Sequence, residues 1–532
     1  MKRLFVCCDG TWNSPTQVHD GVPTPTNVVR FYNALLKQGG DGIAHERYYH
    51  PGVGVSTQFL QVLWEGVTGA GLRRNIKSAY KWLCENYDEG DQIHLIGFSR
   101  GAFTVRCVSG MVTRVGLIRR GAPPALAVGW KDVDAAYVAY RSAQPPKFGA
   151  GVSADASMGI HFIGVWDTVG AYGIPRGFSP LHWVLRLIQA ASRCLWPNKL
   201  YAEWLDSGEF RNLELADKVR HACHAVAIDE KRANYAPTLW LTEPKPLSDG
   251  SMQSIEQTWF TGVHADTGGG YREAGLSDIA LGWMLERAEA AAAGAPLFSD
   301  EMRGQVTREA YPVLHDSYDR FPFKLLATLP RACPDLGAPA APLPYGQSVH
   351  RSALERLRNP PIFQAPYRAV REPLAVGSSI TVPIYAREQW NATALYVRRG
   401  ENYRLTAAGQ WRDSQIAPTG PQGGGFGLLR NPFWFLKRCR GEKWMALMGA
   451  VSALANPSAA GDAAELLQFH IGADIIMLGL NKDGYLYAFA NDAWAFYDNN
   501  TGSVMLRIER LPDTPAAALP GPGAPGLSAV AV

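Results

Sequence analysis

The sequence lacks the cysteine patterns of disulfide-rich or zinc-dependent proteins. Its 532 residues include only eight cysteines, and none of these are spaced as metal ligands usually are. Cys7 and Cys8 are adjacent in an apolar run that we expect to form a strand, where small buried thiols are common. We therefore expect a reduced set of cysteines, as in cytosolic proteins, rather than a disulfide framework.

Long apolar runs and a strong excess of one charge are also missing. No segment has the roughly 20 uncharged apolar residues of a membrane-spanning helix. The apolar run at the start is interrupted by Asp9, so it is shorter than the core of a signal peptide. These features predict synthesis in the cytoplasm without a cleavable signal. The net charge of +4 and the absence of a long basic run predict no nucleic-acid partner.

The chain is long enough for more than one core, and its hydrophobic pattern changes along its length. A chain of 532 residues predicts two or three domains. Apolar segments near residues 4–8, 93–96, 161–165 and 258–263 alternate with helical patterns at 75–87 and 102–112. That alternation is typical of an α/β fold with a mostly parallel sheet. From residue 380 the pattern has period two, which indicates an antiparallel β-sandwich.

These changes define the expected domain boundaries. We expect an α/β domain over residues 1–375, with a cap or insertion at about 171–255, followed by a β-sandwich over residues 376–511. The tail, 512–532, consists largely of Pro, Ala and Gly with almost no charge. A segment of that composition has too little apolar surface to bury, so we expect it to be disordered.

One short motif predicts a nucleophile. Ser99 lies in a Gly-x-Ser-x-Gly segment between an expected strand and an expected helix, and Gly97 and Gly101 flank it. In a nucleophile elbow, two such glycines allow the sharp turn that raises the serine above the sheet. The following helix brings the Arg100 N–H to a position where it can bind an oxyanion. The alternative is a tight strand-to-helix turn without chemistry.

A serine nucleophile requires a base and an acid, which in this fold follow it in the order acid, then His. Asp167 and His264 each stand at the end of a later strand, in that order. Asp167 could instead cap the turn after it, and Asp266 is an alternative acid that more plausibly orders the adjacent glycine loop. Five other histidines compete with His264, but none ends a strand beside so many glycines: His50, His161, His221, His224 and His350.

A second oxyanion donor is expected from the loop after the first strand. Gly10 permits close approach of the backbone, so we assign this role to the N–H of Gly10 or Thr11. Asp9 is then expected to brace the loop rather than to take part in the chemistry. The triad needs no cofactor.

Six motifs in this order resemble those of the type VI secretion phospholipase effector family, over roughly residues 1–370. They are Cys8-Asp9-Gly10-Thr11-Trp12-Asn13, Thr26-Asn27-Val28, Gly52-Val53-Gly54, the Ser99 segment, Val165-Trp166-Asp167-Thr168-Val169-Gly170, and Gly262-Val263-His264 through Gly268-Gly269-Gly270-Tyr271. The resemblance implies an α/β-hydrolase domain that cleaves carboxylic esters of phospholipids at a membrane surface, with Ser, Asp and His as the triad. It also implies delivery into target cells by the type VI route, a secretion-apparatus partner and an immunity protein.

The C-terminal region resembles the calcium-dependent, galactose-binding bacterial lectins over about residues 380–510. The resemblance rests on Ala490-Asn491-Asp492, on Asp498-Asn499-Asn500-Thr501-Gly502-Ser503, and on Ala407-Ala408-Gly409-Gln410-Trp411 and Gly420-Pro421-Gln422-Gly423. It implies a carbohydrate partner and one structural Ca²⁺, a cation that prefers oxygen ligands. Carried over by position, the ligands are Asp492, the carbonyl of Phe496, Asn499, Asn500 and Asp413. A long insertion at residues 426–463 departs from that family, and an ordinary turn rich in Asn and Asp is the alternative.

Two basic and aromatic segments are candidates for contact with lipid. Residues 181–196 combine an apolar helical face with a polar stripe, which suits a lipase cap but equally a helix packed on the core. Residues 432–438 have the composition of an interfacial anchor.

Three functions fit the sequence. The first is a phospholipase with a lectin-like targeting module. The second is an esterase that removes acyl groups from glycans, and the third is a non-catalytic carbohydrate-binding protein on a hydrolase scaffold. The presence of Ser99, Asp167 and His264 together argues against the third, because a degenerate site usually loses one of them.

Overall fold

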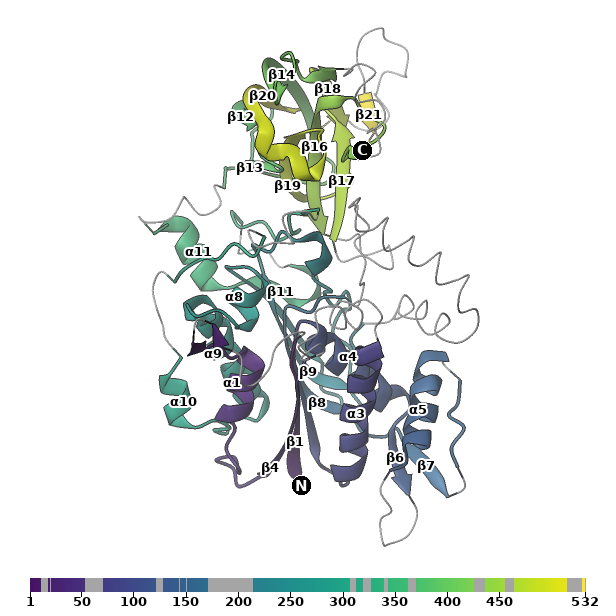
Figure 1. Cartoon of the computed structure of the whole chain (residues 1–532). Helices are drawn as coiled ribbons and strands as arrows, with labels where there is room; N and C mark the ends of the chain where they lie inside the picture. Colours follow the sequence, from purple (N-terminus) through teal and green to yellow (C-terminus); the bar gives the residue numbers. More distant parts are fainter. Residues whose placement is uncertain are drawn as a thin grey trace.

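The computed structural model of the chain has an α/β part and a C-terminal β-sandwich (Figure 1). It describes residues 1–10, 18–19, 21–52, 70–120, 128–142, 144–149, 151–170, 214–306, 312–318, 327–338, 343–361, 370–424, 436–454, 464–513 and 529–531. The predicted fold class, α/β followed by an antiparallel β-sandwich, is confirmed.

The α/β part is built on a seven-stranded sheet in the order β11-β10-β9-β8-β5-β1-β4, in which all neighbouring strands are parallel. The strands are β1 (Lys2–Cys8), β4 (Ala44–His50), β5 (Gln92–Phe98), β8 (Ile160–Trp166), β9 (Val219–Ala227), β10 (Ser254–Phe260) and β11 (Gln347–Val349). The chain first moves from β1 to β4 and then returns to place β5 on the other side of β1. Ligand sites of parallel α/β sheets form at such a reversal, beyond the carboxyl ends of the strands.

Helices cover both faces of this sheet. The sheet separates α3 (Ala70–Asn86), α4 (Arg100–Arg114) and α5 (Trp130–Ser142) from α1 (Asn27–Ala34), α9 (Gly275–Ala291) and α10 (Asp300–Gly304) (Figure 1). Two more helices, α8 (His264–Gly268) and α11 (Arg351–Arg358), follow β10 and β11. The described α/β part also has two small antiparallel sheets of two strands each. One pairs β2 (Val18–His19) with β3 (Val22–Pro23), and the other pairs β6 (Leu117–Arg120) with β7 (Val152–Asp155).

The alternation of side chains along β1 explains why a central strand has a continuous apolar sequence. Leu4, Val6 and Cys8 pack with α3 and α4, whereas Phe5 and Cys7 pack on the opposite face with α1 and α9. Successive side chains of a strand point to opposite faces, so a strand covered on both sides is apolar at every position.

The C-terminal sandwich encloses a separate core between two five-stranded sheets. One sheet contains β12 (Ser379–Tyr385), β14 (Asn402–Asp413), β18 (Asp474–Leu478), β20 (Asn500–Leu511) and β21 (Ala529–Ala531). The other contains β13 (Asn391–Val397), β15 (Gln422–Gly424), β16 (Trp444–Leu454), β17 (Ala464–His470) and β19 (Gly484–Ala490). Apart from β21, neighbouring strands are antiparallel.

One part of the tail that we expected to be disordered is a strand. Ala529–Ala531 form β21, which pairs in parallel with the edge strand β18. An edge strand presents unpaired backbone groups, and an apolar segment of this kind can satisfy them. Composition alone gave no signal for this pairing.

The sandwich lies beyond the carboxyl ends of the parallel strands (Figure 1). A shared apolar cluster joins the two parts: Val226, Ile228 and Trp259 of the α/β part pack with Tyr396, Tyr485 and Tyr487 of the sandwich. The edge of the sheet where α/β enzymes place their chemistry is therefore the edge that faces the sandwich.

Candidate active site

Ser99 occupies the turn between β5 and α4. Its backbone has φ 57° and ψ −123°, a left-handed conformation that a residue other than glycine seldom adopts. The Ser99 N–H donates to the Trp166 carbonyl at 3.0 Å, which fixes the turn to β8. Strain of this kind persists only where the surroundings enforce it, and it is common at catalytic residues.

The two glycines of the motif are required by close packing. A Cβ on Gly101 would lie 2.1 Å from the Cys8 carbonyl oxygen, and one on Gly97 would lie 2.7 Å from the backbone of Ala102. α4 can therefore start directly behind β1 and β5 only if both positions are glycine. The geometry of a nucleophile elbow, predicted from the motif, is present.

Asp167 and His264 are brought together by the sheet. Asp167 follows β8, His264 is the first residue of α8 after β10, and the Asp167 Oδ2 atom is 2.5 Å from His264 Nδ1. Asp167 is fully buried and has φ 40°, so its backbone is also strained. The carboxylate can only accept, so Nδ1 carries the hydrogen and Nε2 is the basic nitrogen.

Two aromatic rings locate the imidazole beside the elbow. The ring centroid of His264 lies 4.6 Å from that of Phe98, which precedes Ser99, and 4.9 Å from that of Tyr235. Gly268 makes room for Phe98, because a Cβ there would lie 2.0 Å from the phenyl ring. The residues predicted as nucleophile, acid and base thus gather at one edge of the sheet.

The electrostatics keep the acid ionised and the base neutral. Burial alone would raise the pKa of Asp167, but the charge of Arg331 and the hydrogen bonds from His264 and Arg331 outweigh it and lower this pKa. Burial also lowers the pKa of His264 below its usual 6.5, although its hydrogen bond to Asp167 acts in the opposite direction. A neutral imidazole at neutral pH can accept a proton.

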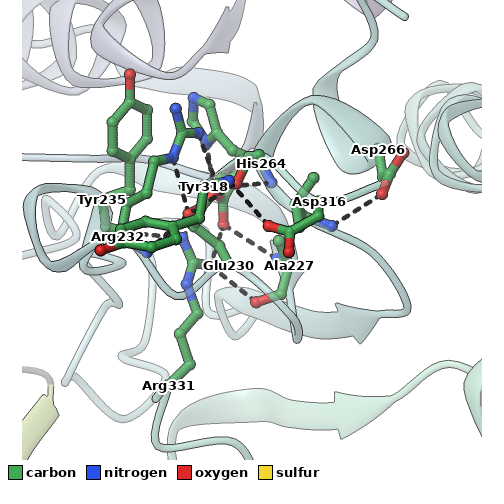
Figure 2. A network of polar contacts seen from close by, with 12 residues as sticks. Ala227, Glu230, Arg232, Tyr235, His264, Asp266, Asp316, Tyr318 and Arg331 are labelled. Carbon is green, nitrogen blue, oxygen red and sulfur yellow. Dashed lines mark hydrogen bonds and ion pairs between the residues drawn. The ribbon is translucent and has the colours of Figure 1, made fainter. Parts of the chain in front are cut away.

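A buried carboxylate network, which the sequence did not reveal, supports the base. The Glu230 carboxylate accepts from the backbone N–H of His264 at 3.2 Å and from Arg232 Nε and Nη2 at 2.9 and 2.8 Å (Figure 2). The guanidinium of Arg232 lies 3.6 Å from the centre of the Tyr235 ring, which in turn packs on His264. Glu230 and Arg232 belong to no recognisable motif, so only the three-dimensional arrangement identifies them.

Asp266, the alternative acid, is directed elsewhere. Its Oδ1 atom is 2.6 Å from His315 Nδ1, and its Oδ2 atom accepts from the N–H groups of Val263 and His315. Figure 2 shows its carboxylate turned away from His264. Asp266 therefore orders the loop that carries His264, as we expected of it if it was not the acid.

The loop after β1 is braced by Asp9. Its carboxylate accepts from Thr26 Oγ1 at 2.7 Å, from the Tyr49 hydroxyl at 2.9 Å and from the Gly10 N–H at 2.7 Å. The Gly10 N–H is therefore already engaged, which weakens its assignment as an oxyanion donor. Thr11 lies outside the described residues, whereas Arg100 begins α4, and the first N–H groups of a helix lack intrahelical acceptors.

The C-terminal residues assigned to calcium also lie together. Asp413 pairs in register with Asn500, and the Asn500 side-chain amide donates to Asp492 Oδ2 at 2.8 Å. Within the described residues, the buried Asn500 Oδ1 atom has no hydrogen-bond donor. Asn499 and Phe496 belong to the turn Trp494–Asn499 just before β20. Carboxylate, amide and carbonyl oxygens of this kind fit a hard cation.

Most of the two segments considered for lipid contact lies outside the described residues. This applies to all of residues 181–196 and to residues 432–435. Arg438 is described, and its guanidinium is buried against Trp390, Phe489 and Trp494 at 3.6, 3.4 and 4.1 Å from their ring centres. It therefore packs inside the protein instead of anchoring it to a membrane. Across the described ranges, the helices include none long and apolar enough to cross a membrane.

A cavity of about 700 Å³ lies away from this site, between α9 and the strands and helix at the β11 edge. Trp283, Arg287, His350 and Arg356 are among the residues that line it, and none of the predicted site residues does. This cavity therefore does not mark the predicted site.

More than half of the chain matches one known family. Residues 2–287 match the family model "T6SS, Phospholipase effector Tle1-like, catalytic domain". An uncharacterised protein of Saccharomyces cerevisiae, YEL023C, is 28% identical over 254 residues, which are 44% of this chain but only 32% of the yeast protein. The chain thus spans about a third of that relative's length.

Two solved structures are similar at lower identity. An uncharacterised protein from Pseudomonas aeruginosa is 19% identical, with a TM-score of 0.32 over 57% of this chain and 47% of the other. The N-terminal domain of EclA, described as a PllA-like lectin, is 20% identical, with a TM-score of 0.17 over 24% of this chain and 94% of that domain. The family model covers the elbow, Asp167 and His264, and the chain belongs to the Tle1-like family of type VI secretion phospholipase effectors.

Proposed function

We propose that Ser99, His264 and Asp167 form the catalytic triad of a phospholipase of the A type, which cleaves the carboxylic esters of membrane phospholipids. The observation that carries this proposal is the buried 2.5 Å contact between Asp167 and His264, which holds the imidazole against the ring that precedes Ser99. The membership of the family supports the lipid substrate.

The reaction follows from the positions of the groups. Ser99 Oγ attacks the ester carbonyl while His264 Nε2 removes its proton, and Asp167 stabilises the imidazolium that forms. The Arg100 N–H, at the start of α4, binds the developing oxyanion. His264 then protonates the leaving alcohol, which departs as a lysophospholipid, and the acyl group remains as an ester on Ser99. Water, deprotonated by His264, releases the fatty acid and restores the serine.

The C-terminal sandwich is proposed as a targeting module that resembles a calcium-dependent lectin. One Ca²⁺ would be held by Asp413, Asp492, Asn499, Asn500 and the Phe496 carbonyl. The buried Asn500 Oδ1 atom, which has no hydrogen-bond donor among the described residues, supports this assignment. The ion would order the loop before β20 and bind the hydroxyl groups of a sugar. The remaining partners are an immunity protein and the type VI apparatus, which would deliver the protein into target cells.

Hydrolysis of purified vesicles tests the enzymatic part. The full chain is added to vesicles of phosphatidylethanolamine and phosphatidylglycerol, and the products are identified by mass spectrometry. We expect free fatty acid and lysophospholipid, and we expect neither from Ser99→Ala. Ser142→Ala, at the exposed end of α5, is the matched control and should behave like the wild type. Release of a headgroup, or hydrolysis only of an acylated glycan, would contradict the proposal.

A further inference from the structure

Arg331 holds the carboxylate of the proposed catalytic acid, although it lies beyond the residues that match the catalytic-domain family. Its Nη1 and Nη2 atoms donate to Asp167 Oδ1 and Oδ2 at 2.5 and 2.9 Å. The same two nitrogens donate to the carbonyls of Ala227 at 2.8 Å and Tyr235 at 2.5 Å. Figure 2 shows the side chain reaching this network from a separate segment. Four acceptors therefore fix the guanidinium.

This ion pair is buried on both sides. Arg331 is 3% exposed and Asp167 is 0% exposed, so neither charge is solvated by bulk water. A buried carboxylate that loses its partner is destabilised as an anion, which raises its pKa. The bidentate pairing also sets the plane of the Asp167 carboxylate, and therefore the direction from which Oδ2 accepts the hydrogen of His264 Nδ1.

The segment that carries Arg331 is attached to the α/β part on one side. Thr328 forms a β-bridge with Arg232, and the Leu329 N–H donates to the Lys231 carbonyl at 2.7 Å. We name residues 327–338 the strap. On this side the strap borders the Glu230–Arg232 pair that supports His264.

On its other side the strap is held by the C-terminal sandwich. Ser452 of β16 donates its hydroxyl to the Pro330 carbonyl at 2.8 Å, next to Arg331 itself. The Tyr485 hydroxyl of β19 accepts from the Leu336 N–H at 2.8 Å, and Thr328 exchanges hydrogen bonds with Gln389 and Trp390. Polar contacts from the sandwich thus fall on Thr328 and Pro330 near the start of the strap and on Leu336 near its end.

Apolar packing reinforces these bonds. Cys333 and Leu336 of the strap are buried in the cluster that includes Tyr396, Tyr485 and Tyr487 of the sandwich and Val226 of β9. β9 ends at Ala227, whose N–H donates to Asp167 and whose carbonyl accepts from Arg331. The strap therefore lies between the sandwich and the strand end that surrounds the acid.

We propose that Arg331 is a positioning residue for the triad and that the C-terminal sandwich, by holding the strap, sets the hydrolytic activity at Ser99. The sandwich is thus part of the catalytic unit in addition to any role in targeting. This inference rests on the proposed triad, because Arg331 acts only through Asp167. A displacement of reacting groups by about 1 Å can cost about a hundredfold in rate. The position in which the sandwich holds the strap therefore affects kcat.

The first test compares Arg331→Gln and Arg331→Lys in the full chain with a soluble short-chain ester, p-nitrophenyl butyrate, so that membrane targeting does not enter. We expect Arg331→Gln to lower kcat about a hundredfold with KM little changed. The acidic limb of its kcat/KM profile should move to higher pH for two reasons. Without the charge of Arg331 the pKa of Asp167 rises, and the ionised carboxylate, no longer neutralised by Arg331, raises the pKa of His264 further. Arg331→Lys keeps the charge, so it should keep the acidic limb and lose less kcat.

The matched control is Arg220→Gln, which removes a guanidinium that pairs with Asp249 at the opposite end of β9. It should leave the kinetics unchanged. If Arg331→Gln has wild-type kcat and pH profile, Arg331 does not position the acid and the inference is overturned. If the wild type hydrolyses neither the soluble ester nor vesicles, the proposed function itself fails, which is a different result.

The second test leaves Arg331 in place and loosens its attachment from the sandwich side. Ser452→Ala with Tyr485→Phe removes one bond at each end of the strap, and we expect kcat for the soluble ester to fall about two- to thirtyfold. Ser503→Ala with Tyr385→Phe is the matched control, because these residues pair across β12 and β20 on the far sheet of the sandwich. Wild-type kcat in the first double variant would show that the sandwich does not set the activity.

Discussion

Asp167 and His264 are 97 residues apart in the chain, yet Oδ2 of Asp167 lies 2.5 Å from Nδ1 of His264, and both residues are buried. The contact exists because Asp167 follows β8 and His264 follows β10, and parallel strands bring their carboxyl ends to the same edge. Each residue is held from behind, Asp167 by Arg331 and His264 by the Glu230 carboxylate at its N–H. The site is therefore organised before substrate binds.

Substitution of the triad residues should give a graded response. His264→Ala is expected to reduce ester turnover as severely as Ser99→Ala, by several orders of magnitude, because it removes the base that moves the proton. Asp167→Asn should be damaging but milder, since the acid only orients the base and stabilises its cation. Turnover of a soluble ester by the full chain measures all three.

Asp266→Asn is the matched control for the acid. Its carboxylate bonds His315 and the N–H of Val263, and does not touch His264. We therefore expect near wild-type turnover. A crippled Asp266→Asn beside a fully active Asp167→Asn would reverse our assignment of the acid. Circular dichroism should accompany Asp167→Asn, because this change leaves the buried Arg331 without its counter-ion.

The parts of this arrangement that could be predicted from sequence are those fixed by local rules. The elbow combines a strand, two glycines that packing requires and a helix start, and all of these can be recognised within ten residues. The chain order of acid and base follows from the fold. β1, β5, β8 and β10 were each expected from apolar runs, with boundaries that differ by a few residues.

The parts that could not be predicted depend on contacts between distant segments. Arg331 and Glu230 look like ordinary charged residues in the sequence. Arg331 acquires its role because the strap crosses the end of β9, and Glu230 acquires its role because its carboxylate meets the backbone N–H of His264. The apolar pattern of β9 is weak because three of its nine residues are charged or histidine, and β21 takes its conformation from pairing with β18. The hydrogen bond from the Gly10 N–H to Asp9 likewise has no signal in the sequence.

Two inactive variants of the nucleophile, Ser99→Gly and Ser99→Ala, should differ in stability, because glycine relieves the backbone strain at this position. Ser99 has φ 57° and ψ −123°, a conformation that glycine adopts more easily than serine or alanine. Strain of this type costs on the order of 1–3 kcal/mol, part of which the flexibility of glycine in the unfolded chain offsets. We expect the free energy of unfolding of Ser99→Gly to exceed that of Ser99→Ala by about 1 kcal/mol.

Urea unfolding of the two inactive variants measures this difference without any effect of catalysis. Gly90, which has φ 88° at an open turn, offers the converse control, because Gly90→Ala should destabilise the protein. A Ser99→Gly variant less stable than Ser99→Ala would mean that the elbow is not strained.

Acid should destabilise the fold through buried histidines. Burial lowers the pKa of His94 well below 6.5, with smaller contributions from His161, Arg3, His45 and His221, and neither ring nitrogen of His94 has a hydrogen-bond partner among the described residues. Burial likewise lowers the pKa of His221 to about 4. Each of these groups binds a proton in the unfolded chain at higher pH than in the folded one. Stability should therefore begin to fall below about pH 6.5 and continue to fall towards pH 4.

His94→Phe isolates this effect. The ring of His94 already packs among aromatic rings, 4.6 Å from Phe5 and 6.0 Å from Phe162, so phenylalanine keeps the contacts and removes the titrating group. Between pH 7 and pH 5 the variant should lose up to about 2 kcal/mol less stability than the wild type. The quantity to compare is the change of the free energy of unfolding with pH, because the larger ring also shifts the absolute stability.

Calcium should stabilise the C-terminal sandwich if the proposed ligands bind it. A ligand that binds only the folded state adds RT ln(1 + [L]/Kd), about 2.7 kcal/mol at a hundredfold excess over Kd. Melting the full chain with calcium and with chelator should therefore reveal a transition whose midpoint rises with the metal. Asp492→Ala should abolish the shift, because it removes a proposed ligand that lies beside another, with Oδ2 bonded to the amide of Asn500.

Asp474→Ala is the matched control for calcium binding. It breaks only the exposed pair with Arg404, keeps every proposed ligand and should retain the shift. If the wild type binds no calcium by elemental analysis and its midpoint does not move, the turn before β20 is an ordinary Asn-rich and Asp-rich turn, and the likeness to calcium-dependent lectins does not extend to the metal.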